Sequence, residues 1–313
     1  MIRDLRRADA PRLFELLEQN FPEESALLGN RPEGFEQVVR RVFRWDTRLL
    51  LGFLRLTGRP VFRYIVVEED RTVVATALVT FPARAAYVSN VIVDPDHRRR
   101  GYAKRMLELA QEYGRRARRQ YLALDVLDSN TPARTLYESV GFRPLRAASD
   151  LLREGLTEFG TGRSRADPWV RPFARSDAPL IVAIARRQAP AEVEKVLPIG
   201  PGAFVGSSLT SKMLASEDAS WVVDRGAGPE GYVAASVSRV ASAGQMAAPV
   251  LSERLDPALG VALARTALDW CADRKVQRVL CRVAEYNTWG RAAVDPLGFR
   301  LARTGRTLYR SID

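Results

Sequence analysis

The sequence contains a single histidine, His97, two cysteines and four lysines among its 313 residues. A Ser/His/Asp triad, a Cys/His pair or a multi-histidine metal site would each have to use His97, so most hydrolytic and metal-dependent chemistries fit poorly. We expect no metal. Cys271 and Cys281 cannot build a disulfide scaffold and form no CxxC pair, which indicates reduced thiols in a cytoplasmic protein.

Long apolar runs are also missing. Uncharged apolar stretches such as Leu49–Leu54 fall far short of the ~20 residues that a membrane span needs. The chain opens with MIRDLRRADAP, which places acids and arginines where a signal peptide carries its apolar segment. We therefore expect neither a membrane-bound nor a secreted protein.

Positive charge is abundant but spread along the chain. Of 48 basic residues 44 are arginine, and the net charge of +11 divides into +6 over residues 1–150 and +5 over residues 151–313. Without a basic patch interleaved with aromatic residues, a nucleic-acid partner is disfavoured. The hydrophobic fraction of 46% is typical of a globular chain, and the length suggests two domains.

Apolar periodicity predicts alternating helices and strands in the first half. Glu68, Glu69, Asp70 and Arg71 form a polar turn between the first two of three strands, which indicates an antiparallel meander. The predicted helices span 9–20, 35–56, 101–119 and 132–140, and the predicted strands span 61–67, 73–81, 86–93 and 121–127, with one more strand after Phe142.

Two segments of the sequence recur. IRDLRRADAP at 2–11 corresponds to VRPFARSDAP at 170–179, and NTPARTLYESVGFR at 130–143 corresponds to NTWGRAAVDPLGFR at 287–300. The offsets are 168 and 157 residues, so loop lengths changed while the order was kept. This similarity indicates a duplicated domain. We predict domains at 1–152 and 169–313, joined by a polar, glycine-bearing linker at 153–168.

The run VSNVIVDPDHRRRGYAKRMLELA predicts a strand, a tight turn and a helix. A helix N-terminus offers unpaired backbone N–H groups and the positive end of a dipole, so a turn next to it can cradle an anion. Gly101 permits unusual dihedral angles there. An RxxGxA motif alone is not specific.

The downstream spacing N-x-x-A-x-x-x-Y-x-x-x-G-F, carried by Asn130, Ala133, Tyr137, Gly141 and Phe142, makes the pattern specific. Together with RRRGYA it resembles the GNAT superfamily of N-acetyltransferases, and the weaker second copy makes the tandem arrangement similar to that of mycothiol synthases. The resemblance implies an α/β (α+β) fold of two tandem domains, each a mixed, mostly antiparallel sheet with splayed central strands flanked by helices.

The resemblance also implies acetyl-CoA as co-substrate. Its pyrophosphate would lie on the backbone amides of the RxxGxA turn, and its pantetheine arm would pair with the main chain of the preceding strand. The implied coenzyme-binding residues are Val91, Ile92, Val93, Arg98, Arg99, Arg100, Gly101, Tyr102, Ala103, Lys104, Asn130, Arg134 and Tyr137.

Acyl transfer to an amine needs a base for the nucleophile and a proton for the departing thiolate. Tyr137, whose family counterpart commonly protonates the thiolate, is the candidate acid. Asp125 is the candidate base, because burial near apolar walls would raise its pKa into a useful range. Ser89, Asn90 or a water chain are alternatives to Asp125. We interpret His97 as a packing residue.

The second copy departs from this pattern. If Gly260 is aligned with Gly101, Pro257 falls opposite Arg98, and the Asn287 alignment places Gly290 and Val294 opposite Ala133 and Tyr137. No thiolate acid remains there. We expect a catalytically silent second domain that shapes the acceptor cleft, with coenzyme binding without turnover as an alternative.

The sequence therefore predicts an N-acetyltransferase that moves an acetyl group from acetyl-CoA to a primary amine of a small molecule by direct attack in a ternary complex. Acetylation of a peptide or protein amine is one alternative, and a non-catalytic acyl-CoA sensor or assembly module is another. We expect a monomer or homodimer without nucleic-acid or membrane partners.

Overall fold

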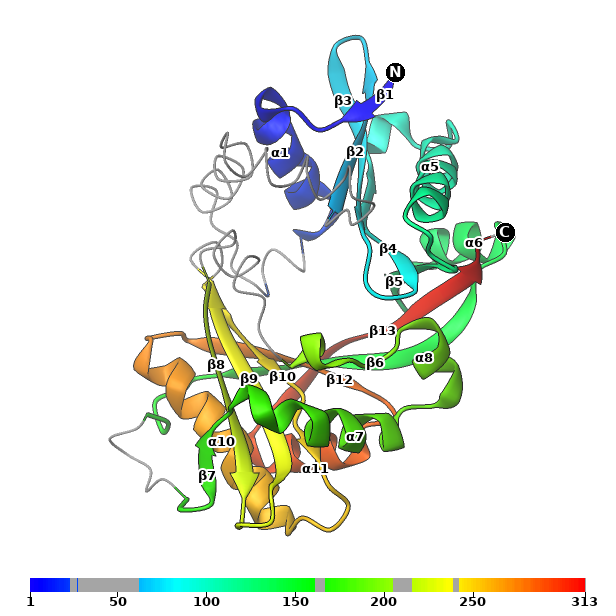
Figure 1. Ribbon diagram of the computed structural model, residues 1–313. Helices are drawn as coiled ribbons and strands as arrows, with labels where there is room; N and C mark the ends of the chain where they lie inside the picture. Colours follow the sequence, from blue (N-terminus) through cyan, green and yellow to red (C-terminus); the bar gives the residue numbers. More distant parts are fainter. Residues whose placement is uncertain (23–26, 28–61, 161–166, 205–215, 239–241, 313) are drawn as a thin grey trace.

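The computed structural model describes residues 1–22, 27, 62–160, 167–204, 216–238 and 242–312. One mixed sheet of 13 strands runs through both halves of the chain, with helices on its two faces (Figure 1). The strand order is β1-β2-β3-β4-β5-β13-β6-β12-β10-β9-β8-β7, and β11 pairs with β9 outside this path. The predicted helical region 35–56 lies outside the described residues.

The first half confirms the meander and the helices that follow it. The β2–β3 turn is shorter than expected, because Glu68 and Glu69 still belong to β2 and only Asp70 and Arg71 turn, with φ angles of 48° and 62°. The elements are β1 Ile2–Asp4, η1 Arg7–Asp9, α1 Ala10–Asn20, β2 Phe62–Glu69, β3 Thr72–Thr80, β4 Ala85–Val93, η2 Pro95–His97, α5 Tyr102–Arg116, β5 Tyr121–Leu127, α6 Thr131–Ser139 and β6 Arg143–Glu154.

The second half repeats this order, as the duplication predicts. Its elements are β7 Val170–Pro172, η3 Arg175–Asp177, α7 Ala178–Gln188, α8 Ala191–Val196, η4 Pro201–Ala203, β8 Ser216–Asp224, β9 Pro229–Ser238, β10 Gly244–Ala247, β11 Val250–Leu251, α10 Pro257–Asp273, β12 Arg278–Ala284, α11 Thr288–Val294, η5 Asp295–Leu297 and β13 Arg300–Ser311.

The repeated residues make the same contacts in both copies. Arg3 donates two hydrogen bonds to the carboxylate of Asp9, at 2.6 and 2.9 Å, and Arg171 does the same to Asp177, at 2.8 and 2.9 Å. Bidentate arginine–carboxylate pairs fix geometry as well as charge. These pairs hold the first strand of each copy against the start of its first helix.

The last strand of each half is exchanged. β13 lies between β5 and β6 and is antiparallel to both, whereas β6 pairs on its other side with β12. The C-terminal strand therefore completes the sheet of the first half, and the C-terminus lies beside α6 (Figure 1). The sequence did not indicate this exchange. The boundaries 1–152 and 169–313 stay a prediction, and backbone hydrogen bonds of the sheet cross between those ranges.

Each half has its own apolar core. In the first half, Met106, Leu107 and Ala110 of α5 pack on the sheet. In the second half, α10 packs on the sheet, and both free cysteines lie in that core with no exposure, so burial raises the pKa of each thiol to about 12. Leu156 and Phe159, within the predicted linker, are buried in this same core.

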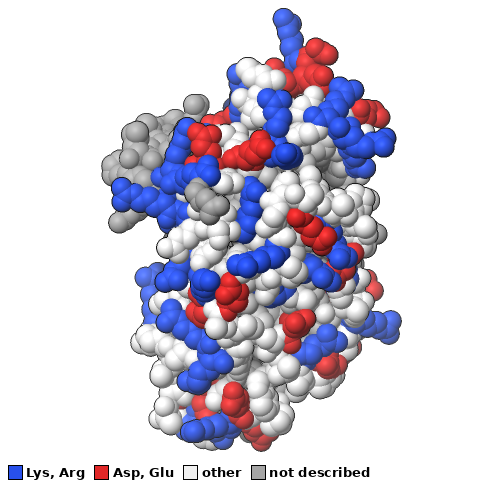
Figure 2. Space-filling model, turned by 90° about the vertical axis from the view of Figure 1, so that its right-hand side faces the viewer, with Lys and Arg blue, Asp and Glu red and all other residues white. Residues whose placement is uncertain are grey.

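The surface charges are mixed. Figure 2 shows Lys and Arg side chains interspersed with Asp and Glu over the face drawn. Such a surface has no extended field of one sign on that face. Among the helices in the described ranges, none has both the length and the apolar character of a transmembrane span.

Candidate active site

A gap opens in the sheet of the first half between β4 and β5. The two strands are parallel and pair only from Ala85–Tyr121 to Val88–Leu124. Beyond that point β4 carries a bulge, where the register with β3 shifts and Asn90 adopts a φ of 51°. A bulge inserts one residue, bends the strand and interrupts the ladder. The expected splay of the central strands is thus present, and Asn90 marks where it begins.

The bulge also sorts the β4 side chains between the two faces of the sheet. Val91 and Val93 pack with the α5 core, whereas Ile92 is buried against Leu16 of α1. Tyr87 shares the α1 face with Ile92, because their β3 partners, Thr80 and Thr76, are four residues apart. The gap therefore has an α5 side and an α1 side.

The turn before α5 leaves the helix N-terminus without a side-chain cap. Gly101 occupies the N-cap position with a φ of 80°, a left-handed conformation that favours glycine, and Arg99 has a φ of 62°. Because no side chain of the described residues caps the first turn of α5, its N–H groups are available to an anion. Ala103 adds only a methyl group at this end of the helix, and Arg99 and Lys104 are exposed cations beside it.

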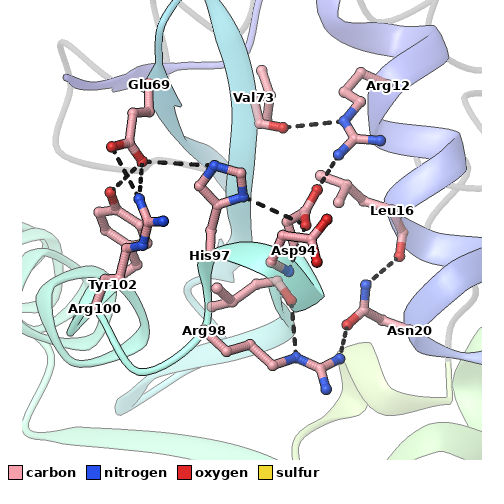
Figure 3. A network of polar contacts seen from close by, with 12 residues as sticks. Arg12, Leu16, Asn20, Glu69, Val73, Asp94, His97, Arg98, Arg100 and Tyr102 are labelled. Atoms are coloured by element: carbon pink, nitrogen blue, oxygen red, sulfur yellow. Dashed lines mark hydrogen bonds and ion pairs between the residues drawn. The ribbon is translucent and has the colours of Figure 1, made fainter.

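The other side chains of the turn are tied to the protein (Figure 3). Arg98 donates to the carbonyl of Val93 at 3.4 Å and to Oδ1 of Asn20 at 2.8 Å. Arg100 forms an ion pair with Glu69 at 3.2 Å. The guanidinium groups of Arg98 and Arg100 therefore brace the turn against neighbouring elements, and pyrophosphate binding by the backbone amides of the turn stays a prediction.

Glu69 joins the tip of the β2–β3 hairpin to the turn. The Tyr102 hydroxyl donates to Glu69 at 2.7 Å, and this hydrogen bond lowers the pKa of Glu69. His97 lies between two carboxylates, 3.8 Å from Glu69 and 3.5 Å from Asp94 (Figure 3). Asp94 in turn pairs with Arg12 of α1. His97 thus links the β2–β3 hairpin to the turn that follows β4.

Tyr137 lies on the α5 side of the gap, on α6. Its side chain is 5% exposed, its ring packs on Phe142 with centroids 5.9 Å apart, and its hydroxyl has no hydrogen-bond partner among the described residues. Burial raises the pKa of Tyr137 to about 12. The phenol therefore stays protonated at neutral pH.

Asn130 and Arg134 make local contacts at the start of α6. The Asn130 side chain caps the helix by accepting from the Ala133 N–H at 3.2 Å, and Arg134 donates to the Asp128 carbonyl at 3.4 Å. Asn287 caps α11 in the same way through the Gly290 N–H. The repeated asparagine thus has a capping role in both copies, and a coenzyme contact by Asn130 or Arg134 stays a prediction.

Asp125 lies on the α1 side of the gap among polar groups that include residues of the second half. The expected burial against apolar walls is wrong, because Asp125 is an exposed residue surrounded by polar side chains. Thr307 of β13 donates to it at 2.7 Å, and Arg282 of β12 forms an ion pair with it at 3.1 Å. Burial, the charge of Asp125 and a hydrogen bond to Asp125 together raise the pKa of the Tyr87 hydroxyl. Tyr87, Arg282 and Thr307 were not predicted as site residues from the sequence. The signal available for Arg282 was the repeat offset of 157 residues, which aligns it with Asp125.

The corresponding opening in the second copy is bridged. β10 and β12 are parallel and also pair only from Gly244–Val279 to Ala247–Arg282. Beyond that point Asn287, at the start of α11, donates to the carbonyl of Pro249, between β10 and β11, at 3.0 Å. At Gly290 a Cβ atom would lie 2.3 Å from the same carbonyl. Asn287 is buried, whereas its counterpart Asn130 is exposed.

The helix N-terminus of the second copy is also occupied. Asp256 caps α10 by accepting from the Ala258 N–H at 2.8 Å, which places a negative charge where a diphosphate would bind. The alignment of Gly260 with Gly101 is wrong, because α10 begins at Pro257 and Gly260 lies inside it without a positive φ. The helix starts earlier in the second copy, and the turn is lost. Val294 does stand on α11 where Tyr137 stands on α6.

The first half thus presents an uncapped helix end and a buried phenol on one side of a strand gap and a carboxylate on the other. Among the described residues no group of three or more His, Cys, Asp or Glu side chains is arranged to hold a metal ion. Such a site suits a phosphorylated thioester bound from the α5 side and a nucleophile approaching from the α1 side.

Comparisons with known proteins bear on the family match of the first half and on the fold. The sequence model of the acetyltransferase (GNAT) family matches residues 11–142. No curated protein matches the chain. Solved structures with similar folds include a tandem GNAT protein from the clavulanic acid biosynthesis pathway, with 17% identity, a TM-score of 0.63 and coverage of 100% of this chain and 98% of that one.

Two further structures share the fold over the whole length. A GCN5-related N-acetyltransferase from Sphaerobacter thermophilus has 18% identity and a TM-score of 0.64, covering 100% of this chain and 95% of its own. A putative acetyltransferase from Pyrococcus horikoshii has 13% identity and a TM-score of 0.61, with coverage of 99% and 89%. The tandem α/β architecture predicted from the sequence is confirmed.

Proposed function

We propose that the first half of this chain, whose residues 11–142 match the acetyltransferase (GNAT) family model, transfers an acetyl group from acetyl-CoA to a primary amine of a small molecule. The family supports acyl transfer from acyl-CoA to an amine. The finer assignments, namely the acetyl group, the small-molecule acceptor and the catalytic residues, are our proposal.

The difference between the two copies carries this proposal. In the first half the helix N-terminus has no side-chain cap, β4 and β5 separate and Tyr137 adjoins the gap. In the second half Asp256 caps the helix and Asn287 ties α11 to Pro249. We infer one catalytic site per chain, with the second half as a wall and support of that site.

The residues of the first half have separate tasks in this reaction. Backbone N–H groups of the turn and of the first turn of α5 bind the diphosphate, and the β4 main chain at Val91 and Val93 aligns the pantetheine arm. Asp125 accepts the proton that the amine loses as its nitrogen bonds to the thioester carbonyl carbon. Tyr137 donates a proton to the sulfur as the carbon–sulfur bond breaks, which leaves an amide and a free thiol.

Thiol release from acetyl-CoA tests the proposal. The purified chain, mixed with acetyl-CoA and a panel of small primary amines, should release free CoA thiol and form the matching amide, detected by mass spectrometry. Gly101→Val should raise the KM for acetyl-CoA at least ~10-fold, because a β-branched residue is strained at a φ of 80°. Arg116→Gln, an exposed change elsewhere on α5, serves as the control.

Three results would contradict the proposal. Folded protein that binds CoA yet releases no thiol with any amine would support a non-catalytic acyl-CoA module. Radiolabel from acetyl-CoA found only on polypeptides would move the activity to peptide or protein amines. Activity that survives Gly101→Val with unchanged KM would remove the turn before α5 from the site.

A further inference from the structure

A polar cluster on the α1 face of the central sheet is built from residues that the duplication makes equivalent. At an offset of 157, Asp125 corresponds to Arg282, Arg146 to Arg303 and Asp150 to Thr307. The strand exchange brings the pairs together, because Thr307 lies opposite both Asp125 and Arg146, while Asp150 lies opposite both Arg282 and Arg303. The two ends of this cluster can therefore be compared directly.

At one end the arginines face a carboxylate. Arg303 donates to Asp150 at 2.7 Å, and the Arg282 guanidinium lies 3.8 Å from the same side chain. The Asp150 side chain is only 9% exposed. Burying a charge is costly unless an opposite charge and hydrogen bonds compensate it. At this end of the cluster, Arg303 and Arg282 compensate the negative charge of Asp150.

At the other end the carboxylate is replaced by a hydroxyl. Arg146 corresponds to Arg303, yet it faces Thr307 where Arg303 faces Asp150. Its Nε donates to the Thr307 hydroxyl at 3.2 Å and its Nη1 donates to the Tyr286 hydroxyl at 3.4 Å. Among the described residues no carboxylate pairs with this partly buried guanidinium. The carboxylate at this end, Asp125, bonds to Thr307 and Arg282, so Arg146 does not have the direct carboxylate partner that Arg303 has in Asp150.

Arg146 also lies next to the proposed reaction centre. The Thr307 hydroxyl that accepts from Arg146 donates in turn to Asp125, so two hydrogen bonds connect the guanidinium with the candidate base. Both groups are on the face of the sheet opposite α5, away from the turn proposed for the diphosphate. A ligand that reaches Arg146 from this face would have its other end beside Asp125.

We propose that Arg146 binds a carboxylate of the acceptor, so that the substrate is a small molecule carrying a primary amine and a carboxylate a few bonds apart, such as an amino acid. This inference rests on the proposed acetyltransferase function. A planar guanidinium can bind a carboxylate through two parallel N–H donors, which would orient the amine toward Asp125. Thr307, in place of an aspartate, leaves Arg146 without the carboxylate partner that Arg303 has in Asp150.

Matched acceptors test the inference. Each amino acid of a panel is compared with its carboxamide, which keeps the amine and the carbon skeleton but removes the negative charge. The wild-type chain should prefer the acid by ~10- to 100-fold in kcat/KM, a range expected for a charge-assisted hydrogen bond at a partly exposed site. The comparison is made at a fixed concentration of free amine, because the amide group lowers the amine pKa.

Variants at Arg146 separate recognition from support of the fold. Arg146→Gln should raise KM for the acids and erase the preference while leaving kcat/KM for the carboxamides within ~3-fold, since only uniform binding is lost. Arg146→Lys should restore part of the preference. Arg116→Gln removes the same charge from an exposed position on α5 that is paired with Glu112, and it should leave both series unchanged.

Each alternative outcome supports a different conclusion. Carboxamides accepted as well as acids by the wild-type chain would overturn the inference and leave the acetyltransferase proposal standing. An equal loss for both series in Arg146→Gln would make Arg146 a support of the sheet only. If that variant does not fold, the wild-type comparison and Arg146→Lys decide. No turnover with any amine of either series overturns the proposed function together with this inference.

Discussion

At the scale of single residues, removal of the Tyr137 hydroxyl can test catalysis without disturbing the fold. Tyr137 is 5% exposed, and its hydroxyl has no hydrogen-bond partner among the described residues, so removing the hydroxyl should leave no unsatisfied group behind. We predict that Tyr137→Phe lowers kcat by ~10²- to 10⁴-fold, the usual contribution of a positioned acid. Its melting temperature and CoA affinity, measured by calorimetry, should match those of the wild-type chain.

The pH profile provides an independent check on Tyr137. Burial raises the pKa of Tyr137 to about 12, so the phenol keeps its proton throughout the working range, and deprotonation of Tyr137 should cause no fall in rate below pH ~10. The same raised pKa means that its contribution to stability is complete below the unfolded pKa of about 10 and is lost as pH rises toward about 12. A kcat unchanged by the phenylalanine variant would exclude the tyrosine as the acid.

Individual site residues were predictable only where their surroundings are local in sequence. Gly101 and Tyr137 could be placed because the turn and the short helix that carry them lie within their own motifs. The surroundings of Asp125 could not be predicted, because Arg282 and Thr307 approach it from strands more than 150 residues away. Arg98 and Arg100 stay predicted to contact the coenzyme through their backbone amides, and the protein groups to which their side chains bond could not be predicted from sequence spacing.

The short helix α11 packs closely against the segment between β10 and β11, and Gly290 permits this close approach. At Gly290 a Cβ atom would lie 2.3 Å from the Pro249 carbonyl and 2.5 Å from the Asn287 amide. Gly→Ala in a helix normally stabilises by ~1 kcal/mol. We predict the opposite sign here, with Gly290→Ala lowering the free energy of unfolding by ~2 kcal/mol or more, as for other overpacked sites. Urea denaturation measures it.

The equivalent position in the first copy is the matched control. Ala133 holds a Cβ atom on α6 beside the open gap, so Ala133→Gly should cost only the ~1 kcal/mol of helix propensity. Gly290→Ala that stabilises the chain would show that α11 is not packed tightly on the strand, and the closed second copy would lose its support.

Most elements were predictable because apolar periodicity is a local property. The strand predicted at 121–127 is β5 to the residue, and the helix predicted at 9–20 is α1 with its preceding turn. The error at Gly260 has a physical cause. With Asp256 as a cap and Pro257 in the first turn, α10 can start earlier than α5, and one glycine in an apolar helix gave no sign of that change.

At the scale of the whole molecule, the sequence predicted two copies but not their strand exchange. β6 and β13 are equivalent at an offset of 157, so each has a pattern that either sheet could accept. The exchanged and unexchanged strand pairings differ in the polar cluster across β5, β13, β6 and β12. In the exchanged pairing of this structure, Asp125 faces Thr307 and pairs with Arg282. Arg282 and Thr307 are the residues by which the second copy differs from the first at this face.

This difference predicts how the first half behaves alone. Residues 1–154 lack β13 and expose the β5 edge, and an exposed edge recruits another strand. We expect two such chains to associate by placing β6 of each against β5 of the other. In that dimer Asp150 of the partner would take the place of Thr307, directly opposite Asp125. Sedimentation equilibrium should therefore show a weak dimer at neutral pH.

Removing the charge repulsion between Asp125 and Asp150 of the partner subunit should strengthen that dimer. Like charges directly opposite each other on neighbouring strands destabilise a sheet by ~0.2–1 kcal/mol per pair, and the symmetric dimer contains two such pairs. Asp125→Asn in residues 1–154 should then lower the dimer dissociation constant by roughly 2- to 30-fold, whereas Glu112→Gln on the exposed side of α5 should not change it. A 1–154 chain that is monomeric and as stable as the intact protein would mean that β6 can pair with β5 of its own sheet. The strand exchange would then be one of two accessible pairings and not a requirement of the fold.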